Sequence, residues 1–240
     1  MKKLNYKKEC VKLLKLGLPP HVFIGNIIPV YLGAKKSGFC FEDELLVNDF
    51  KKVKKIGKKL FKNYRTMMLP IVVPYGKEGM KIFFFTKDQK IFTKLNNLQK
   101  LLINKNKIGG DPFEDLKIIE KIGELLEYPE CCIKNFKGVR SKKRNIEIET
   151  SKKLKKSKTN NKIFFAYEFY PCSFSCKKSL EIGRRILSTL EKEDSFLGES
   201  FKIILDMNYD KLKNIFETFE DRFTNRMNWN GKIYALAKKK

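Results

Sequence analysis

The sequence contains the same short pattern twice, a Tyr-Pro step followed closely by two cysteines. The pattern reads EYPECC at residues 127–132 and FYPCSFSC at residues 169–176. Proline fits the first turn of a helix, where its missing N–H needs no partner. We therefore expect Cys131 and Cys132 in the first turn of a helix that runs to about Phe136.

The second copy of the pattern also predicts the start of a helix. Ser173 or Ser175 can act as the N-cap, which places Cys172 just outside the helix and Cys176 within its first turn. Both cysteine pairs are then at helix N-termini, where backbone N–H groups and the helix dipole favour a thiolate. The same position favours the negative charge of a thiolate-ligated metal.

Four of the six cysteines are candidate ligands of a metal ion or cluster: Cys131, Cys132, Cys172 and Cys176. Cys10 lies on a helical stretch and Cys40 lies between two phenylalanines, so we expect both to be small buried hydrophobic residues. The one histidine, His21, is far from the motifs in sequence, which makes a Cys2His2 site unlikely to form. Four sulfur ligands suit Zn²⁺ or an iron–sulfur cluster.

The spacing within the two pairs favours an iron–sulfur cluster over zinc. The pairs read C-C and C-x3-C, whereas a zinc ribbon uses two C-x2-C pairs. Because adjacent residues of a helix point in different directions, we expect Cys131 and Cys132 to reach one compact zinc ion only with a local distortion. A zinc site, metal-free reactive or redox thiols, and unrelated buried cysteines stay open as alternatives.

The motifs YPECC and YPCSFSC resemble those of an archaeal domain family of unknown function. That family carries a YPxCC element and a later PCxxxC element before a helix, and the resemblance covers about Phe113 to Arg185. The matching residues are Tyr128, Pro129, Cys131, Cys132, Pro171, Cys172 and Cys176. Some members have a histidine shortly before the second proline, whereas this chain has Glu168, Phe169 and Tyr170 there. The resemblance supports the site and implies no reaction.

The charge of the chain indicates a polyanionic partner. Lysine and arginine number 52 against 27 acidic residues, which gives a net charge of +25. The segment from Arg140 to Lys162 is basic and poor in apolar residues, so we expect a loop that holds RNA phosphates beside the cysteines. Its candidate nucleic-acid-binding residues are Arg140, Lys142, Lys143, Arg144, Lys152, Lys153, Lys155 and Lys156. The alternative is that these lysines are only solvated surface residues.

Apolar spacing in the first half of the chain indicates an α+β protein of helices and short strands. Helical stripes are predicted at residues 42–65 and 89–103. Between them, MMLPIVVPYG and MKIFFFTK predict two buried strands joined by a turn that contains glycine. The stripe residues are Leu46, Phe50, Val53, Leu60 and Tyr64, followed by Phe92, Leu95, Leu98 and Leu102.

The second half starts with a helix from a capping box at Asp111 and Pro112 to about Tyr128. IFFAYEFY and FKIILDM predict strands, and helical spacing returns at residues 177–190 and 212–223.

We expect two subdomains that meet near Gly109 and Gly110. Residues 1–108 would form an N-terminal α+β subdomain, and residues 109–240 a C-terminal subdomain with the cysteine motifs and a basic loop at 140–162.

Other sequence signals limit the location and the chemistry. The apolar run at residues 22–34 is too short for a membrane span, and lysines interrupt any N-terminal signal sequence, so we expect a cytoplasmic protein without a membrane partner. The chain has no phosphate-binding loop, dinucleotide fingerprint, radical SAM motif or H-E-x-x-H zinc motif. Glu127, Glu130 and Glu168 are the carboxylates near the cysteines, and structural roles at helix ends are favoured over acid–base catalysis. The sequence does not decide whether the protein is an enzyme.

Overall fold

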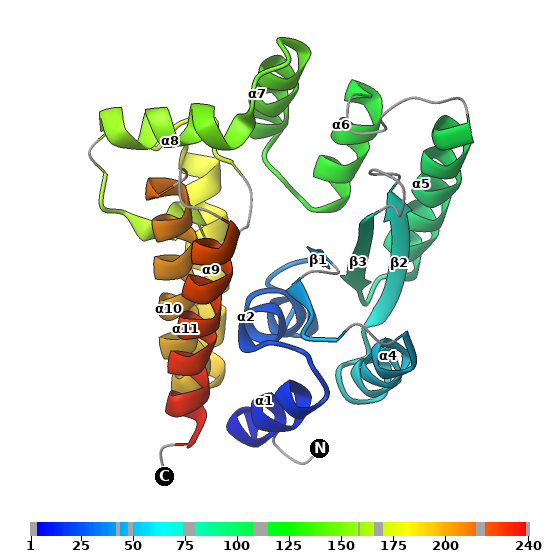
Figure 1. Cartoon of the computed structure of the whole chain (residues 1–240), viewed down its shortest axis with the longest axis vertical. Helices are drawn as coiled ribbons and strands as arrows, with labels where there is room; N and C mark the ends of the chain where they lie inside the picture. Colours follow the sequence, from blue (N-terminus) through cyan, green and yellow to red (C-terminus); the bar gives the residue numbers. More distant parts are fainter. Residues whose placement is uncertain are drawn as a thin grey trace. The chain divides into compact units, whose positions relative to one another are not determined.

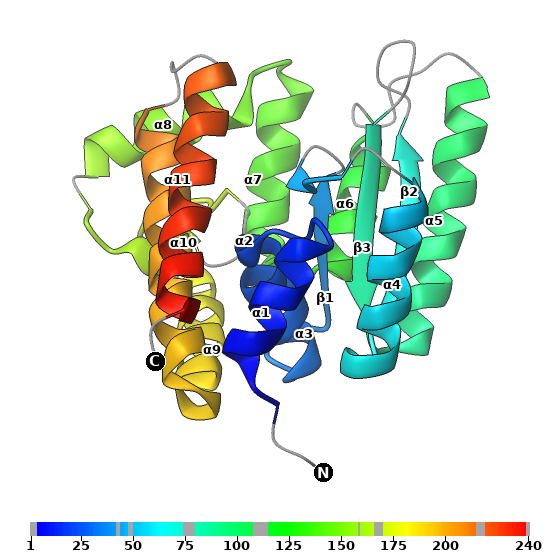
Figure 2. The same cartoon turned by 60° about the horizontal axis from the view of Figure 1, so that its bottom comes forward.

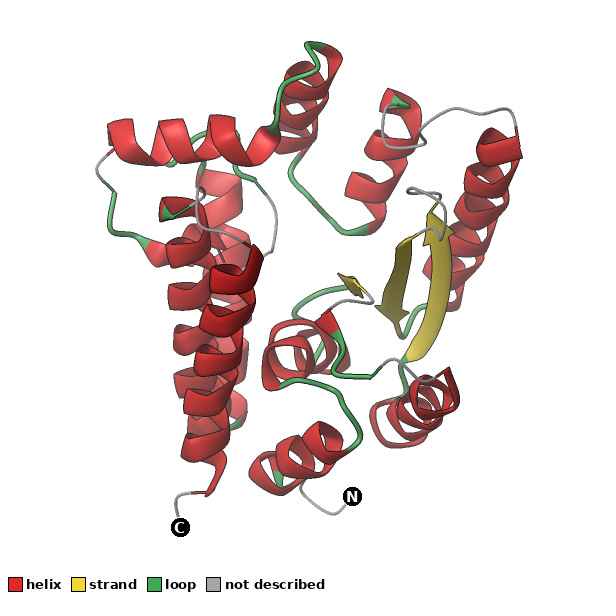
Figure 3. Ribbon diagram, in the orientation of Figure 1, coloured by secondary structure: helices red, strands yellow, loops and turns green. Residues whose placement is uncertain are grey.

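The fold is seen in a computed structural model, which describes residues 4–41, 44–47, 50–73, 80–107, 115–157, 159–165, 170–214 and 219–238. Helices make up most of the described chain, and three short strands form one antiparallel sheet (Figure 3). The predicted α+β class is therefore confirmed. Among the described helices, none is both long enough and apolar enough to cross a membrane.

The chain forms two compact units, Asn26–Arg144 and a unit that joins Met1–Gly25 to Asn145–Lys240. This division differs from the predicted one at residues 108 and 109, because the N-terminal helices pack on the C-terminal ones. The predicted meeting point at Gly109 and Gly110 lies outside the described residues.

The unit of residues 26–144 contains the sheet (Figure 1). The elements of this unit are α3 (Ile28–Tyr31), β1 (Ser37–Phe41), α4 (Phe50–Tyr64), β2 (Met67–Val73), β3 (Met80–Thr86), α5 (Gln89–Lys107), α6 (Leu116–Leu125) and α7 (Glu130–Ser141). Strand β3 lies between β1 and β2 and is antiparallel to both. The two predicted strands are confirmed as β2 and β3, and the turn between them lies outside the described residues.

Helices cover both faces of this sheet, as Figure 2 shows with α4 in front of the strands and α6 behind them. Ile82 and Phe84 of β3 form one apolar core with side chains of α5 and α6. Met68 is paired with Phe85, so both side chains are on the opposite face. There, a Cβ on Gly57 of α4 would lie 2.8 Å from Met68 Cε. The sheet is thus the middle of three layers.

The predicted stripes of α4 and α5 are largely confirmed. Val53, Leu60 and Tyr64 are buried on α4, and Leu95 and Leu98 on α5. Leu46 precedes α4 and is exposed, so its place in the stripe was predicted wrongly. The side chains of Phe50 and Leu102 lie outside the described residues, as does the predicted helix start at Glu42.

The described residues of the second unit form helices joined by turns and contain no strand. Its elements are α1 (Tyr6–Lys15), α2 (Pro20–Val22), the π-helix η1 (Phe23–Ile27, shared with the first unit), α8 (Ile146–Ser157), the 3-10 helix η3 (Lys162–Phe165), α9 (Lys177–Glu193), α10 (Ser195–Lys213) and α11 (Phe219–Lys238). Two long-range hydrogen bonds join the two chain segments of this unit. The Tyr6 hydroxyl donates to Glu193 Oε1 at 2.7 Å, and the backbone N–H of His21 donates to Asn230 Oδ1 at 3.2 Å.

The basic segment of residues 140–162 is not the loop that we predicted. Most of it forms α8, whose residues Ile146, Thr150 and Leu154 recur every four positions and are buried. Asn145 caps this helix, since its Oδ1 accepts from the N–H of Glu147 at 2.8 Å. Two apolar residues with a buried threonine between them are thus enough here for a helix that packs on one face.

Three further predictions of local structure are corrected. FKIILDM lies inside α10 rather than in a strand, because a helix that is buried on most sides has a continuous apolar run. The start of IFFAYEFY forms η3, and its residues 166–169 lie outside the described chain. Asp115 caps α6 by accepting from the N–H of Lys117 at 2.9 Å, whereas the predicted cap at Asp111 and Pro112 lies outside the described residues.

Candidate metal centre

The first cysteine pair follows a tight turn between α6 and α7. The N–H of Tyr128 donates to Gly123 O at 2.8 Å and that of Glu127 to Glu124 O at 3.0 Å, the two bonds of a Schellman helix end. Glu127 has the left-handed backbone conformation that this motif requires, with φ of 57°. The turn therefore fixes the direction in which the chain leaves α6.

Helix α7 then starts directly at the cysteines. The carbonyl of Pro129 accepts from the N–H of Cys132 at 2.8 Å and from that of Ile133 at 3.0 Å. The prediction that both cysteines lie in the first helical turn is confirmed. Pro129 is the N-cap rather than the first helical residue, and α7 continues past the predicted end at Phe136 to Ser141.

Carboxylates near this pair have structural partners. Glu127 accepts from the backbone N–H of Lys36 at 2.9 Å and pairs with its Nζ at 3.2 Å. Glu130 is exposed and pairs with Lys134 at 2.6 Å, and this hydrogen bond raises the pKa of Lys134. Glu127 thus links the end of α6 to Lys36, Glu130 forms an exposed pair within α7, and Glu168 lies outside the described residues.

The second pair brackets a short turn before α9. The N–H of Cys176 donates to Ser173 O at 3.3 Å, and the carbonyl of Cys176 accepts from Leu180 at 3.1 Å. Cys176 is itself the N-cap of α9, which corrects the prediction of a serine cap. Ser173 Oγ instead accepts from the N–H of Ser175 at 3.4 Å, inside the turn. Cys172 lies outside the helix as predicted.

Helix α8 holds this turn in place, a role that the sequence did not reveal. Lys153 Nζ donates to the carbonyl of Cys172 at 3.1 Å, and the hydroxyl of Tyr170 donates to Glu147 Oε1 at 2.6 Å. These partners are 19 and 23 residues apart, so no local pattern could have indicated them. Apolar packing adds to the anchoring, since the ring of Phe174 meets that of Phe164 edge to face at 5.6 Å.

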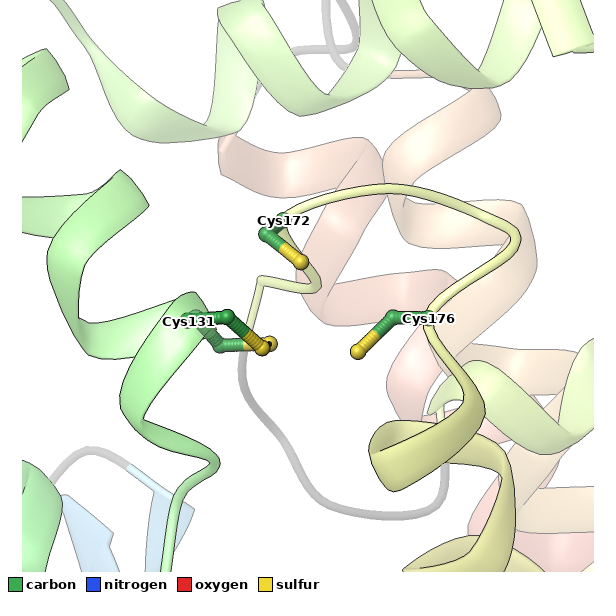
Figure 4. Close-up of side chains that lie close together, drawn as sticks. Cys131, Cys172 and Cys176 are labelled. Carbon is green, nitrogen blue, oxygen red and sulfur yellow. Dashed lines mark hydrogen bonds between the residues drawn. The ribbon is translucent and has the colours of Figure 1, made fainter.

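The sulfur atoms of the four candidate ligands lie close together. All four lie within 4.8 Å of one another, and the sulfur atoms of Cys131 and Cys132 are 3.9 Å apart. Figure 4 shows Cys131, Cys172 and Cys176 pointing toward one another. Cys132 and Cys176 are buried, Cys172 is half-buried and Cys131 is exposed. We call Cys131, Cys132, Cys172 and Cys176 the cysteine site.

The distances within the cysteine site resemble those of a single tetrahedral ion. Zinc–sulfur bonds of about 2.3 Å place the ligand sulfur atoms about 3.8 Å apart. The 3.9 Å separation of Cys131 and Cys132 is close to this value. The two adjacent residues thus bring their sulfur atoms close enough to bind one ion, while the preference for a cluster over zinc stays a prediction.

The two remaining cysteines take no part in the site. Cys10 on α1 and Cys40 on β1 are buried among apolar residues, as predicted. Burial raises the pKa of the Cys10 thiol to about 12. His21 is also buried, with Nδ1 at 3.0 Å from Asn230 Oδ1.

The predicted nucleic-acid-binding residues are divided between the two units. Arg140, Lys142, Lys143 and Arg144 end the first unit, and the four lysines of α8 belong to the second. Lys152 pairs with Glu149 of the same helix at 3.1 Å, and Lys153 donates to the carbonyl of Cys172 in the cysteine turn. Six are exposed: Lys142, Lys143, Arg144, Lys152, Lys155 and Lys156. Their role toward nucleic acid stays a prediction.

Comparison with known proteins places the chain in a family. The pattern of the family described as "Protein of unknown function (DUF483)" matches residues 58–208, which include both cysteine pairs. The chain belongs to the DUF483 family. This confirms the predicted membership of a family of unknown function, while the paired motifs as a feature of DUF483 stay a prediction.

A relative of this DUF483 protein is the "Uncharacterized protein MJ1106" of Methanocaldococcus jannaschii. The two are 37% identical over 81 residues, which is 32% of this chain and 44% of the relative. The match thus spans less than half of the relative's length. No solved structure matches the chain.

Proposed function

We propose that Cys131, Cys132, Cys172 and Cys176 bind one metal ion in tetrahedral geometry, and that this ion is zinc. The observation that carries the proposal is the mutual distance of the four ligand atoms, which is at most 4.8 Å. Four thiolates at the corners of one tetrahedron are a common structural zinc site.

The same distances speak against the iron–sulfur cluster favoured by the motif spacing. In a cluster, thiolates bound to different iron atoms are separated by the cluster itself, so they lie farther apart than thiolates on one ion. A cluster in the cysteine site would therefore have to push the two pairs apart. A single ion requires much smaller adjustments from the observed distances.

A zinc ion with four protein ligands has no open position for a substrate. The proposed role is therefore structural: the ion would hold its four cysteine ligands in one fixed arrangement. Because the ligands must be thiolates, the site belongs in a compartment where thiols stay reduced. We accordingly propose a cytoplasmic location.

Metal analysis and a visible spectrum of anaerobically purified protein test the identity of the ion. Zinc at one ion per chain with a colourless protein is the expected result. If the protein instead contains iron and acid-labile sulfide and absorbs broadly in the visible range, the four cysteines bind an iron–sulfur cluster rather than zinc. If the protein contains neither metal and does not take up zinc when all its thiols are reduced, both metal proposals are wrong and the cysteines are metal-free thiols.

A second proposal is that this zinc-stabilised protein binds nucleic acid, RNA in particular. It is supported by the net charge of +25 and by the exposed side chains of Lys142, Lys143, Arg144, Lys155 and Lys156. Each phosphate contact adds about 0.7 to 0.9 to the slope of log affinity against log salt. We expect the slope of log affinity against log salt to be several units, and to be smaller when Lys155 and Lys156 are replaced by glutamine. A flat slope would refute the proposal.

A further inference from the structure

A cleft of about 560 Å³ lies between α5 and α6 in the unit of residues 26–144. Its size is typical of pockets that hold a small molecule. Ile91, Leu98 and Leu101 of α5 and Leu125 of α6 form its apolar wall. Leu101 is 41% exposed, so its side chain can contact a molecule in the cleft.

Four lysines line the same cleft: Lys36, which pairs with Glu127, and three others, Lys90 and Lys94 from α5 and Lys121 from α6. Lys90 and Lys94 are four residues apart and so share one side of α5. None of these three ammonium groups forms an ion pair with another residue in the part of the chain that the structure describes. Their positive charge is thus available to a ligand.

Two of the three carboxylates in the cleft are already engaged. Asp88 caps α5 by accepting from the N–H groups of Lys90 at 2.7 Å and Ile91 at 3.2 Å. Glu127 is held by Lys36, as described above. Glu124 is the remaining carboxylate, so the lysines of the cleft outnumber the acid groups that can balance them.

We propose that this cleft binds a small polyanion that has a flat apolar body, of the nucleoside triphosphate class. The ammonium groups of Lys90, Lys94 and Lys121 would bind the phosphates as point charges. The base would lie on the wall that includes Leu98 and Leu101. This inference goes beyond the metal site and does not depend on it.

Calorimetric titration of the full, metal-loaded chain with ATP tests the proposal, with tripolyphosphate and adenosine as separate probes. We expect saturable binding of ATP that weakens as salt is raised. The double variant Lys90→Gln/Lys94→Gln should lose about tenfold in affinity for each ammonium removed. Leu101→Gln should weaken the binding of ATP and leave that of tripolyphosphate unchanged.

The matched control is Lys100→Gln/Lys117→Gln. These exposed lysines are also on α5 and α6 and change the net charge equally, but they do not line the cleft. Unchanged ATP affinity in the control, with the loss confined to the cleft variant, supports the proposal. Equal losses in both double variants would assign ATP binding to the general positive field of the protein. That outcome, or the lack of saturable binding at low salt, overturns the proposal.

Discussion

The sulfur atoms of Cys131 and Cys132 lie 3.9 Å apart although the two residues are neighbours in one helix. Both residues are in the first turn of α7, where helical side chains lean toward the N-terminus. No preceding turn of helix stands in their way, so both sulfur atoms can approach the same point. A C-C pair at a helix start can therefore supply two corners of a tetrahedral site.

Thiol reactivity should separate the six cysteines into two groups. In the zinc-loaded protein, we expect slow reaction with an alkylating reagent, because bound thiolates are protected and Cys10 and Cys40 are buried. A strong chelator should make the four thiols of the cysteine site reactive, whereas Cys10 and Cys40 should react only after denaturant is added. Mass spectrometry of the alkylated peptides measures this order. Rapid modification of Cys131 and Cys132 without chelator would show that they are not ligands.

The stability of the fold at alkaline pH should depend on the ionisation of the Cys10 thiol. Its pKa is 9.0 in an exposed setting and about 12 in the fold, so between these values the unfolded chain releases a proton that the folded chain keeps. The contribution of Cys10 to stability is therefore full below pH 9 and falls as the pH rises toward 12. Between pH 8 and pH 10, we expect the free energy of unfolding of the unmodified protein to fall by about 1 kcal/mol more than that of Cys10→Ala. Urea unfolding of both proteins at pH 8 and pH 10 measures it, and an unchanged difference between them would contradict the assignment.

Lys153→Met should weaken zinc binding without removing a ligand. The substitution removes the hydrogen bond from Lys153 to the carbonyl of Cys172, which positions the second cysteine turn. Loss of such a supporting contact lowers metal affinity by about tenfold or more. Competition with a chromophoric chelator measures the affinity.

The control for that substitution is Lys156→Met, which removes the same charge from an exposed position of the same helix. Its zinc affinity should equal that of the unmodified protein. If both variants lose affinity equally, the effect is one of net charge, and the positioning role of Lys153 is wrong.

Two helical glycines should respond in opposite ways to alanine. A Cβ on Gly183 of α9 would collide with the backbone carbonyl of Ile163 in η3, whereas one on Gly138 of α7 meets nothing within 4 Å. Gly183→Ala should lower the free energy of unfolding by about 1–3 kcal/mol. Gly138→Ala should raise it by about 0.5–1 kcal/mol, since alanine restricts the unfolded chain. Chemical denaturation measures both, and a stabilised Gly183→Ala variant would contradict the packing described for α9.

Elements with local signals could be predicted from the sequence. The Tyr-Pro step before Cys131 indicated a helix start because proline has few places in a helix, and the strands β2 and β3 were evident from continuous apolar runs. Helix α8 was missed because Ile146 and Leu154 are the only apolar residues of its buried face, with the polar Thr150 between them. FKIILDM was misread because a helix buried on most sides lacks the alternation that distinguishes it from a strand.

The four cysteines that lie together were grouped from the sequence, whereas the cluster or ion that they would bind stays a prediction. Burial and neighbours separated Cys10 and Cys40 from the other four, which the structure bears out. The preference for a cluster rested on the spacing of the two pairs and on the divergence of adjacent side chains in a helix, whereas the sulfur atoms of Cys131 and Cys132 lie 3.9 Å apart. The contact of Lys153 with Cys172 could not be foreseen, because α8 itself was not expected.

Zinc content of cysteine variants tests the central claim, a single ion held by both pairs. Native mass spectrometry of the reduced protein should find one zinc ion per monomeric chain. Cys132→Ser and Cys176→Ser, one from each pair, should each abolish that zinc, while Cys40→Ser should retain it. Full zinc in either of the first two variants, or zinc found only in a dimer that shares it between chains, would contradict a single four-cysteine site.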